Sequence, residues 1–157
     1  MREILFRGKR TDNGEWIEGG ILQTENWASI YVCKDYQGSM NEPPCCDVEE
    51  YEVIPETVGQ YTGLTDTNGK KTFEGDICRV VYLDKRCGSN GKHYEVENAL
   101  IEEVVFKKGT FCFKTTVEDI ALYRPIGFDI YEKLKIKDFE VIGNIYDNPE
   151  LLEGDKE

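Results

Sequence analysis

The chain has 157 residues, a length that fits one domain or one core with a small appendage. Hydrophobic residues make up 39% of it and aromatic residues 11%, which supports an aromatic-rich core and excludes a wholly disordered chain. The formal net charge of −12, from 19 basic and 31 acidic residues, disfavours anionic partners unless charge is locally segregated. No apolar run is long enough to cross a bilayer, and the charged N-terminus lacks the apolar segment of a signal peptide. We therefore expect a cytoplasmic protein with no membrane contact.

The N-terminal part of the chain predicts a β-hairpin followed by one more strand. Residues 4–10 and 15–22 are strand-like and are joined by Asn13-Gly14, a pair that favours a tight hairpin turn. Trp16 is expected to be a core or cross-strand aromatic residue. Residues 30–33 predict a third, short strand.

Residues 34–50 predict a long irregular loop. They include Pro43-Pro44, and proline cannot join the central ladder of a sheet. Structureless loops of more than ~12–15 residues are usually functional or disordered, so this loop is interpreted either as a partner-binding loop or as a mobile insertion. Its tip would carry Met40, the two prolines and Cys45-Cys46.

The stretch from Gln60 to Tyr82 carries the clearest turn and strand patterns, and the rest of the chain is expected to be organised around it. Asn68-Gly69 predicts a hairpin turn, because both residues tolerate a left-handed backbone. Gly75-Asp76 predicts a tight bend, with the Asp76 carboxylate capping backbone N–H groups. The following β-branched run predicts a strand whose core face carries Cys78, Val80 and Tyr82.

The second half of the chain predicts further short strands that lead to a helical turn. Phe111, Phe113 and Thr115 share a face that we expect to point inward. Pro149 suits the first position of a terminal helical turn, from which Leu151 and Leu152 would dock on the core. The expected elements are a turn at Asn90-Gly91, strands at 100–106, 110–115 and 139–144, a turn at 107–109, and short helical turns at 117–122 and 131–134.

Six or more short strands punctuated by Asn-Gly turns predict a mainly β, β-dominated α+β fold. The expected architecture is a small antiparallel SH3-like barrel with an N-terminal β-hairpin and short helical turns near the C-terminus. We predict a single domain over residues 1–157. Its expected subdivisions are a hairpin and loop region at 1–54, a barrel core at 55–152 and a polar tail at 153–157.

The sequence predicts no catalytic, cofactor-binding or metal-ligating residues. The six cysteines lack the short paired spacing typical of zinc sites, and Cys78 and Cys112 are interpreted as small buried hydrophobic residues. His93, the only histidine, is expected to be a solvated surface residue. The acidic pairs Glu49-Glu50 and Glu102-Glu103 are interpreted as solvated strand edges, where charge discourages aggregation. The sequence holds cysteines at 33, 45, 46, 78, 87 and 112.

Three blocks of sequence resemble the YopX family of phage and prophage proteins. The first is Met1 to Arg7, the second comprises 60–64, 68–70 and 74–77, and the third is Glu140 to Leu152. They lie in the family's order and frame almost the whole chain. The resemblance implies a β-rich, YopX-like fold, a phage origin in a bacterial host and no established biochemical activity, so it transfers no site residues.

Three hypotheses for function follow. The first is a non-catalytic phage accessory protein that binds a protein partner or associates with itself, with no cofactor. The second is nucleic-acid binding, or DNA mimicry directed at a host DNA-binding factor; the net charge disfavours direct binding. The third and weakest is a metal- or carboxylate-dependent enzyme. The stacking residues that the second hypothesis would use are Tyr61, Phe73, Tyr82 and Tyr94.

Overall fold

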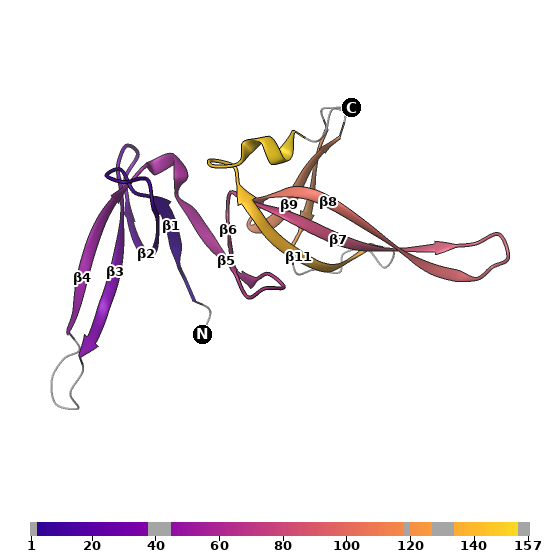
Figure 1. The fold of residues 1–157 in the computed structure, drawn as a ribbon, viewed down its shortest axis with the longest axis horizontal. Coiled ribbons are helices and arrows are strands. Elements are labelled where there is room, and N and C mark those ends of the chain that lie inside the picture. The colour runs from indigo at the N-terminus through magenta and orange to yellow at the C-terminus, as the bar shows by residue number, and fades with distance from the viewer. Residues whose placement is uncertain (1–2, 38–44, 118–119, 127–133, 154–157) are drawn as a thin grey trace. The chain divides into compact units, whose positions relative to one another are not determined.

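The structure is a computed structural model that describes residues 3–37, 45–117, 120–126 and 134–153. The chain divides into two compact units, Met1–Gly63 and Leu64–Glu157. The sequence predicted one domain over residues 1–157 with an inner boundary after Ile54; the boundary between the two units falls between Gly63 and Leu64. Each unit is built on antiparallel strands (Figure 1).

The first unit is a sheet with the strand order β4-β3-β2-β1-β5. Its small core contains Ala28, Ile30 and Val53, all at most 1% exposed. β2 contains Gly19, at which an added Cβ would lie only 2.3 Å from the Tyr31 carbonyl oxygen of β3. The elements of this unit are β1 (Phe6–Lys9), β2 (Trp16–Gln23), β3 (Ala28–Gln37), β4 (Cys45–Val53), the 3-10 turn η1 (Pro55–Thr57) and β5 (Gly59–Thr65), which ends in the second unit.

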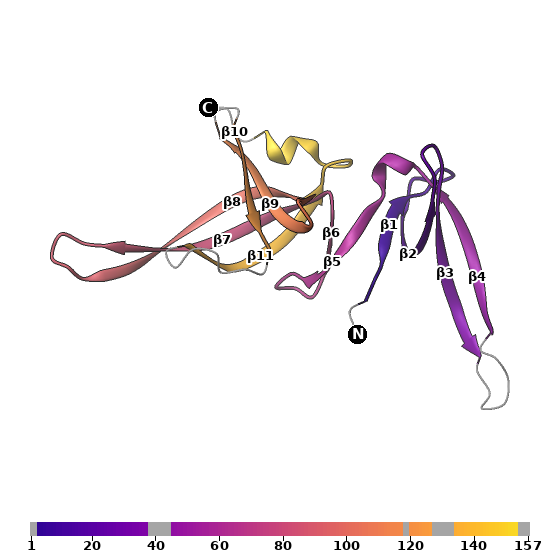
Figure 2. The same cartoon turned by 180° about the vertical axis from the view of Figure 1, so that it is seen from behind.

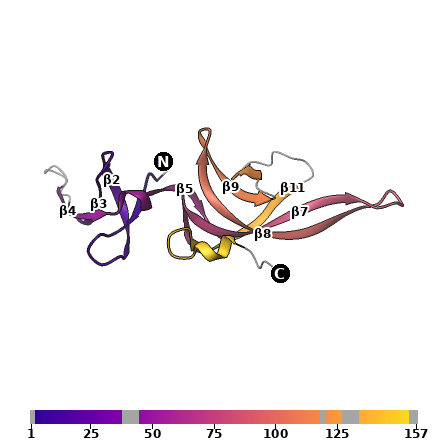
Figure 3. The same ribbon diagram turned by 90° about the horizontal axis from the view of Figure 1, so that it is seen from above.

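The second unit contains a five-stranded sheet with the order β10-β9-β8-β7-β11. β7 and β8 form a long hairpin whose far end extends beyond the other strands of this sheet (Figure 3). The elements of this unit are β6 (Lys71–Phe73), β7 (Asp76–Cys87), β8 (His93–Lys107), β9 (Thr110–Val117), β10 (Ile120–Pro125), β11 (Leu134–Asn144) and the 3-10 turn η2 (Pro149–Leu152).

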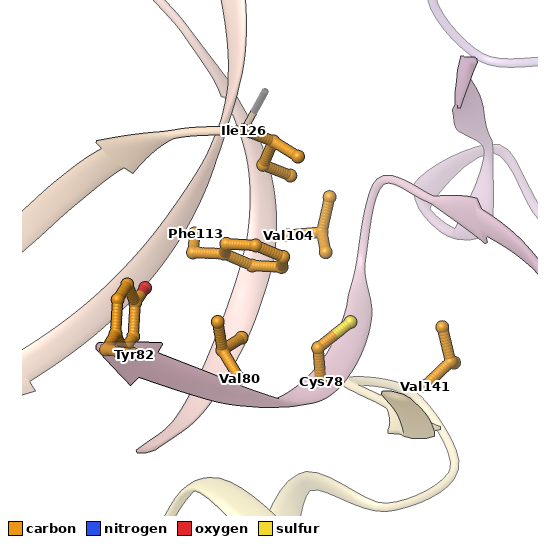
Figure 4. Close-up of a cluster of buried hydrophobic side chains, with 7 residues drawn as sticks. All are labelled: Cys78, Val80, Tyr82, Val104, Phe113, Ile126 and Val141. Carbon is orange, nitrogen blue, oxygen red and sulfur yellow. The ribbon is translucent and has the colours of Figure 1, made fainter. Parts of the chain in front are cut away.

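One face of this sheet carries the larger core. Alternation along β7 places Cys78, Val80 and Tyr82 on this face, and all three are buried as predicted. The cluster is completed by residues from β8, β9 and β11 and by Ile126 (Figure 4). Phe113 is fully buried and Phe111 packs against the cluster, which confirms that this face of β9 points inward.

The turn after β5, within the stretch from Gln60 to Tyr82, is hydrogen-bonded to β11, which lies far along the chain. The Asp66 carboxylate accepts the N–H groups of Asn68 and Lys70, each at 2.9 Å, and that of Val141 at 3.0 Å. Asp66 is 6% exposed. Burial, the largest single influence, raises its pKa, but the three backbone donors together hold the pKa below its usual value. The turn is therefore a buried connection as well as a hairpin.

The mainly β class and the three Asn-Gly turns are confirmed. Gly14, Gly69 and Gly91 all have positive φ angles, between 73° and 79°, as such turns require. The predicted terminal helical turn is present as η2, which begins at Pro149. Among the described residues, no helix is long and apolar enough to span a membrane.

Three expectations about the fold are wrong. The strands that the structure describes form two antiparallel sheets that do not close into a barrel. The expected helical turn at 117–122 is instead the end of β9 and the start of β10, with 118–119 outside the described residues. Much of the expected loop at 34–50 is the hairpin of β3 and β4; of its predicted tip, Met40 and Pro43-Pro44 lie outside the described residues, and Cys45-Cys46 begin β4. The helical turn expected at 131–134 falls almost wholly outside the described residues too.

Candidate functional site

Strands β9 and β10, together with the two lysines before β9, form a basic stretch of an acidic protein. Neither strand contains an acidic residue, and Lys114 and Arg124 lie within them. Lys107 and Lys108 precede β9 at one end of the hairpin, whereas the acidic pair at 118–119 follows β9 at the other end. Locally segregated charge is the condition under which an acidic protein still recognises an anionic group; here that charge comes from Lys107 and Lys108, because Lys114 pairs with Glu103 and Arg124 with Glu102.

A pocket of about 340 Å³ lies at the lysine end of this hairpin, on the face opposite the core. The Lys107 ammonium lies 4.8 Å from the centroid of the Tyr123 ring, within range of a cation–π interaction. Cys112 is only 3% exposed, and burial raises the pKa of its thiol. The pocket is lined by Lys107, Lys108, Thr110, Cys112, Tyr123 and Pro125.

β10 is an end strand of the sheet in the part of the chain that the structure describes (Figure 2). Its apolar side chains are unusually accessible: Ile120 is 63% exposed, Leu122 43% and Tyr123 38%. The opposite case is β4, the end strand of the first unit, which carries Asp47, Glu49, Glu50 and Glu52. Charged edges resist pairing with other chains, and β10 lacks the carboxylates that β4 carries.

A buried polar cluster anchors β10 from the core face. Arg124 forms an ion pair with Glu102 of β8, whose carboxylate also accepts a hydrogen bond from the Tyr82 hydroxyl of β7. The guanidinium carbon of Arg124 lies 5.1 Å from the Tyr82 ring centroid. Glu102 is fully buried, so the ion pair connects β7, β8 and β10 beneath the surface.

Burial decides the electrostatics of this cluster. Desolvation raises the pKa of Glu102, although the Tyr82 hydrogen bond and the Arg124 charge act in the opposite direction. Desolvation, followed by the hydrogen bond to Glu102, also raises the pKa of Tyr82. A carboxyl group with a raised pKa suits general acid–base chemistry, but this one has no exposed surface. We therefore assign it a positioning role for β10.

Two interpretations of the sequence are wrong, one about the acidic residue Glu102 and one about the four aromatic stacking residues. Glu102 is not a solvated edge residue but is fully buried, while Glu103 pairs with Lys114 at 2.7 Å. The stacking platform of the nucleic-acid hypothesis is not formed, because three of its four aromatic residues are buried in the fold. Tyr61 is 6%, Phe73 1% and Tyr82 2% exposed, whereas Tyr94 is 52% exposed.

Other interpretations are confirmed. The Asp76 carboxylate accepts the Phe73 N–H at 2.7 Å and so caps the bend. Cys78 and Cys112 are buried, and His93 is exposed. The side chains of Cys45 and Cys46 lie outside the described residues.

The sequence reasoning missed Glu102 and the β10 strand. The signal for Glu102 was present, because in the predicted strand 100–106 it shares its face with Val104, a core residue. For β10, the run Ile120-Ala121-Leu122-Tyr123 is uniformly apolar and carries no alternation. Such a run suits a strand or a helical turn equally well.

These features define a mainly β protein of two compact units in which β10, an apolar end strand among the described strands, lies beside a pocket lined by two lysines. The model of the YopX protein family matches residues 5–153, and the chain belongs to the YopX family. Among solved structures, protein EF1440 from Enterococcus faecalis is similar in fold, with a TM-score of 0.52 and 22% sequence identity. The match covers 97% of this chain and 99% of that one. No curated protein matches the chain in sequence.

Proposed function

We propose that this protein is a non-catalytic interaction protein that binds another polypeptide through the outer edge of β10. The observation that carries the proposal is the contrast between the end strands β4 and β10. β4 bears four carboxylates, whereas β10 bears none and exposes Ile120, Leu122 and Tyr123. An exposed sheet edge binds an extended segment as an added strand, with main-chain hydrogen bonds supplying affinity.

Membership of the YopX family indicates the biological setting in which the protein would act. Because the chain resembles phage and prophage proteins, we propose that it acts as a phage accessory protein in the cytoplasm of a bacterial host. Arg124 supports the role of β10, since its ion pair with Glu102 holds the strand in place for a partner. A preorganised edge loses less conformational entropy when it binds.

The test compares two single variants that change charge equally. Leu122→Lys adds a charge to the β10 edge, and Tyr94→Lys adds one at the exposed end of the β7–β8 hairpin. Each variant is checked for folding by circular dichroism and then used to capture proteins from a nuclease-treated host lysate. The proposal expects a stoichiometric partner that Leu122→Lys loses and Tyr94→Lys retains. Capture that is unchanged by Leu122→Lys, or no capture at all, overturns it.

A further inference from the structure

One hydrogen bond shows which main-chain N–H and C=O groups of β10 point away from β9, toward the edge of the sheet. The Ile126 N–H donates to the Phe111 carbonyl of β9 at 2.9 Å and so points into the sheet. Because this direction alternates along an antiparallel strand, the N–H and C=O groups of Ala121 and Tyr123 point outward. Pro125, which has no N–H, falls in the same outward set, where an edge strand tolerates proline.

The outward groups and the pocket belong to the same residues. Tyr123 and Pro125 turn their main chain toward the open edge, and both also line the pocket. A strand added beside β10 would place every second side chain on the pocket's face of the sheet. One of those side chains would then enter the pocket, whose lining includes the buried Cys112.

The positive charge of the lysines beside the pocket determines which side chains a bound segment would carry next to the one in the pocket. Lys114 is already paired with Glu103, and Arg124 with Glu102. Lys107 and Lys108 are exposed and form no ion pair with any described residue. Two unneutralised ammonium groups at the rim of a pocket favour carboxylates on the bound segment.

We infer that the segment bound at β10 is an acidic, extended stretch of a partner protein. It pairs with the outward groups of Ala121 and Tyr123, fills the pocket with an apolar side chain and places carboxylates near Lys107 and Lys108. This inference rests on the proposed function and specifies the chemistry of its partner.

Two other occupants fit the site less well. A nucleic-acid backbone has no N–H groups to match the outward carbonyls of β10, and a net charge of −12 repels a long polyanion. The same charge opposes association of two copies of this chain. A short acidic segment carries less charge, and screening over about 8 Å at physiological ionic strength leaves the two local lysines as its main electrostatic contact.

The experiment begins with a displayed library of random ten-residue peptides selected on the full chain. Enrichment of peptides that contain aspartate or glutamate together with β-branched residues is expected. The most enriched peptide is then synthesised, labelled with fluorescein and titrated with the protein by fluorescence anisotropy. Peptides without an acidic excess, or no enriched peptide, would overturn the inference. Capture that depends on Leu122 would in that case still support the proposed function.

Two pairs of variants locate the peptide. Ala121→Pro removes one outward N–H without touching an inward one, and should weaken binding about fivefold or more, whereas Ala121→Val keeps the donor and should not. The double variant Lys107→Gln/Lys108→Gln should weaken binding about fivefold at low salt. Its control, Lys85→Gln/Lys92→Gln, makes the same charge change on the β7–β8 hairpin.

Equal binding by Ala121→Pro and Ala121→Val would overturn the strand-addition geometry. Equal effects of the two lysine pairs would show that only overall charge matters, which also contradicts the inference. Displacement of the peptide by oligo-dT would assign the site to nucleic acid. Light scattering that shows a dimer lost in Ala121→Pro would assign the site to a second copy.

Discussion

Replacing Arg124 with methionine would test whether the buried ion pair holds β10 on the sheet. The substitution keeps an unbranched apolar stem but removes the charge that faces Glu102. The Glu102 carboxylate would then be fully buried with only the Tyr82 hydroxyl as its partner. A buried carboxylate without a countercharge is costly, because it has lost its hydration.

The size of the expected change in the free energy of unfolding follows from how exposed Glu102 and Arg124 are. Removing one member of a buried ion pair costs about 3–5 kcal/mol. The Arg124 side chain is 21% exposed, and the hydrogen bond from Tyr82 survives. We therefore expect Arg124→Met to lower the free energy of unfolding by about 2–3 kcal/mol at pH 7.

The assay is urea unfolding followed by circular dichroism. Tryptophan fluorescence is unsuitable because Trp16 and Trp27 both belong to the first unit. Arg124→Met, Glu102→Gln and the double variant complete a double-mutant cycle. Since Glu102→Gln removes the buried charge, the double variant should be less destabilised than the sum of the singles, by at least about 1 kcal/mol.

The effect of pH provides a second readout. The pKa of Glu102 lies above its ordinary value of 4.5, so folding favours the protonated form. That contribution is present below pH 4.5 and is lost as the pH rises through the folded-state pKa. Arg124→Met removes an influence that lowers this pKa, so its destabilisation should grow from pH 4 to pH 7. An effect that is equal at both values, with additive single variants, would refute the reasoning.

Two further substitutions test the packing of each unit, with unfolding again measured in urea. Asp66→Asn should lower the free energy of unfolding by about 2–4 kcal/mol, because it removes a buried charge that accepts three backbone hydrogen bonds. The control Asp12→Asn, at an exposed position, should change it little. Equal effects of the two substitutions would contradict this account. Because the pKa of Asp66 is lowered, its contribution is present above about pH 3.8 and is lost as the pH falls. Gly19→Ala should cost about 1–3 kcal/mol, since its Cβ would meet the Tyr31 carbonyl. Gly20→Ala, with that oxygen 3.9 Å away, should be nearly neutral, and a neutral Gly19→Ala would refute the close approach.

Structure that depends on residues close together in the chain could be predicted from the sequence. The turn at Asn68-Gly69 and the cap at Asp76 depend on residues close together in the chain, and both have the predicted structure. The core face of β7 followed from alternation and composition, because a strand of period two places the apolar Cys78, Val80 and Tyr82 on one face and the charged Arg79 on the other.

Long-range arrangement was not readable in the same way. Nothing in residues 66–70 indicates that Asp66 will accept a hydrogen bond from Val141, a contact that fixes β11 beside the turn. Closure of a sheet depends on pairing between its end strands, which turn signals do not specify. The burial of Glu102 required knowing that Arg124 lies across the sheet, and that pairing depends on the β10 strand that the sequence reasoning missed.

The capture experiment with Leu122→Lys and Tyr94→Lys tests the central claim most directly. Both variants add one positive charge at an exposed apolar position of the second unit, and only Leu122 lies on the end strand β10. A protein partner retained by Tyr94→Lys and lost by Leu122→Lys is the predicted result. A partner that both variants retain would contradict the claim that this protein acts through the edge of β10.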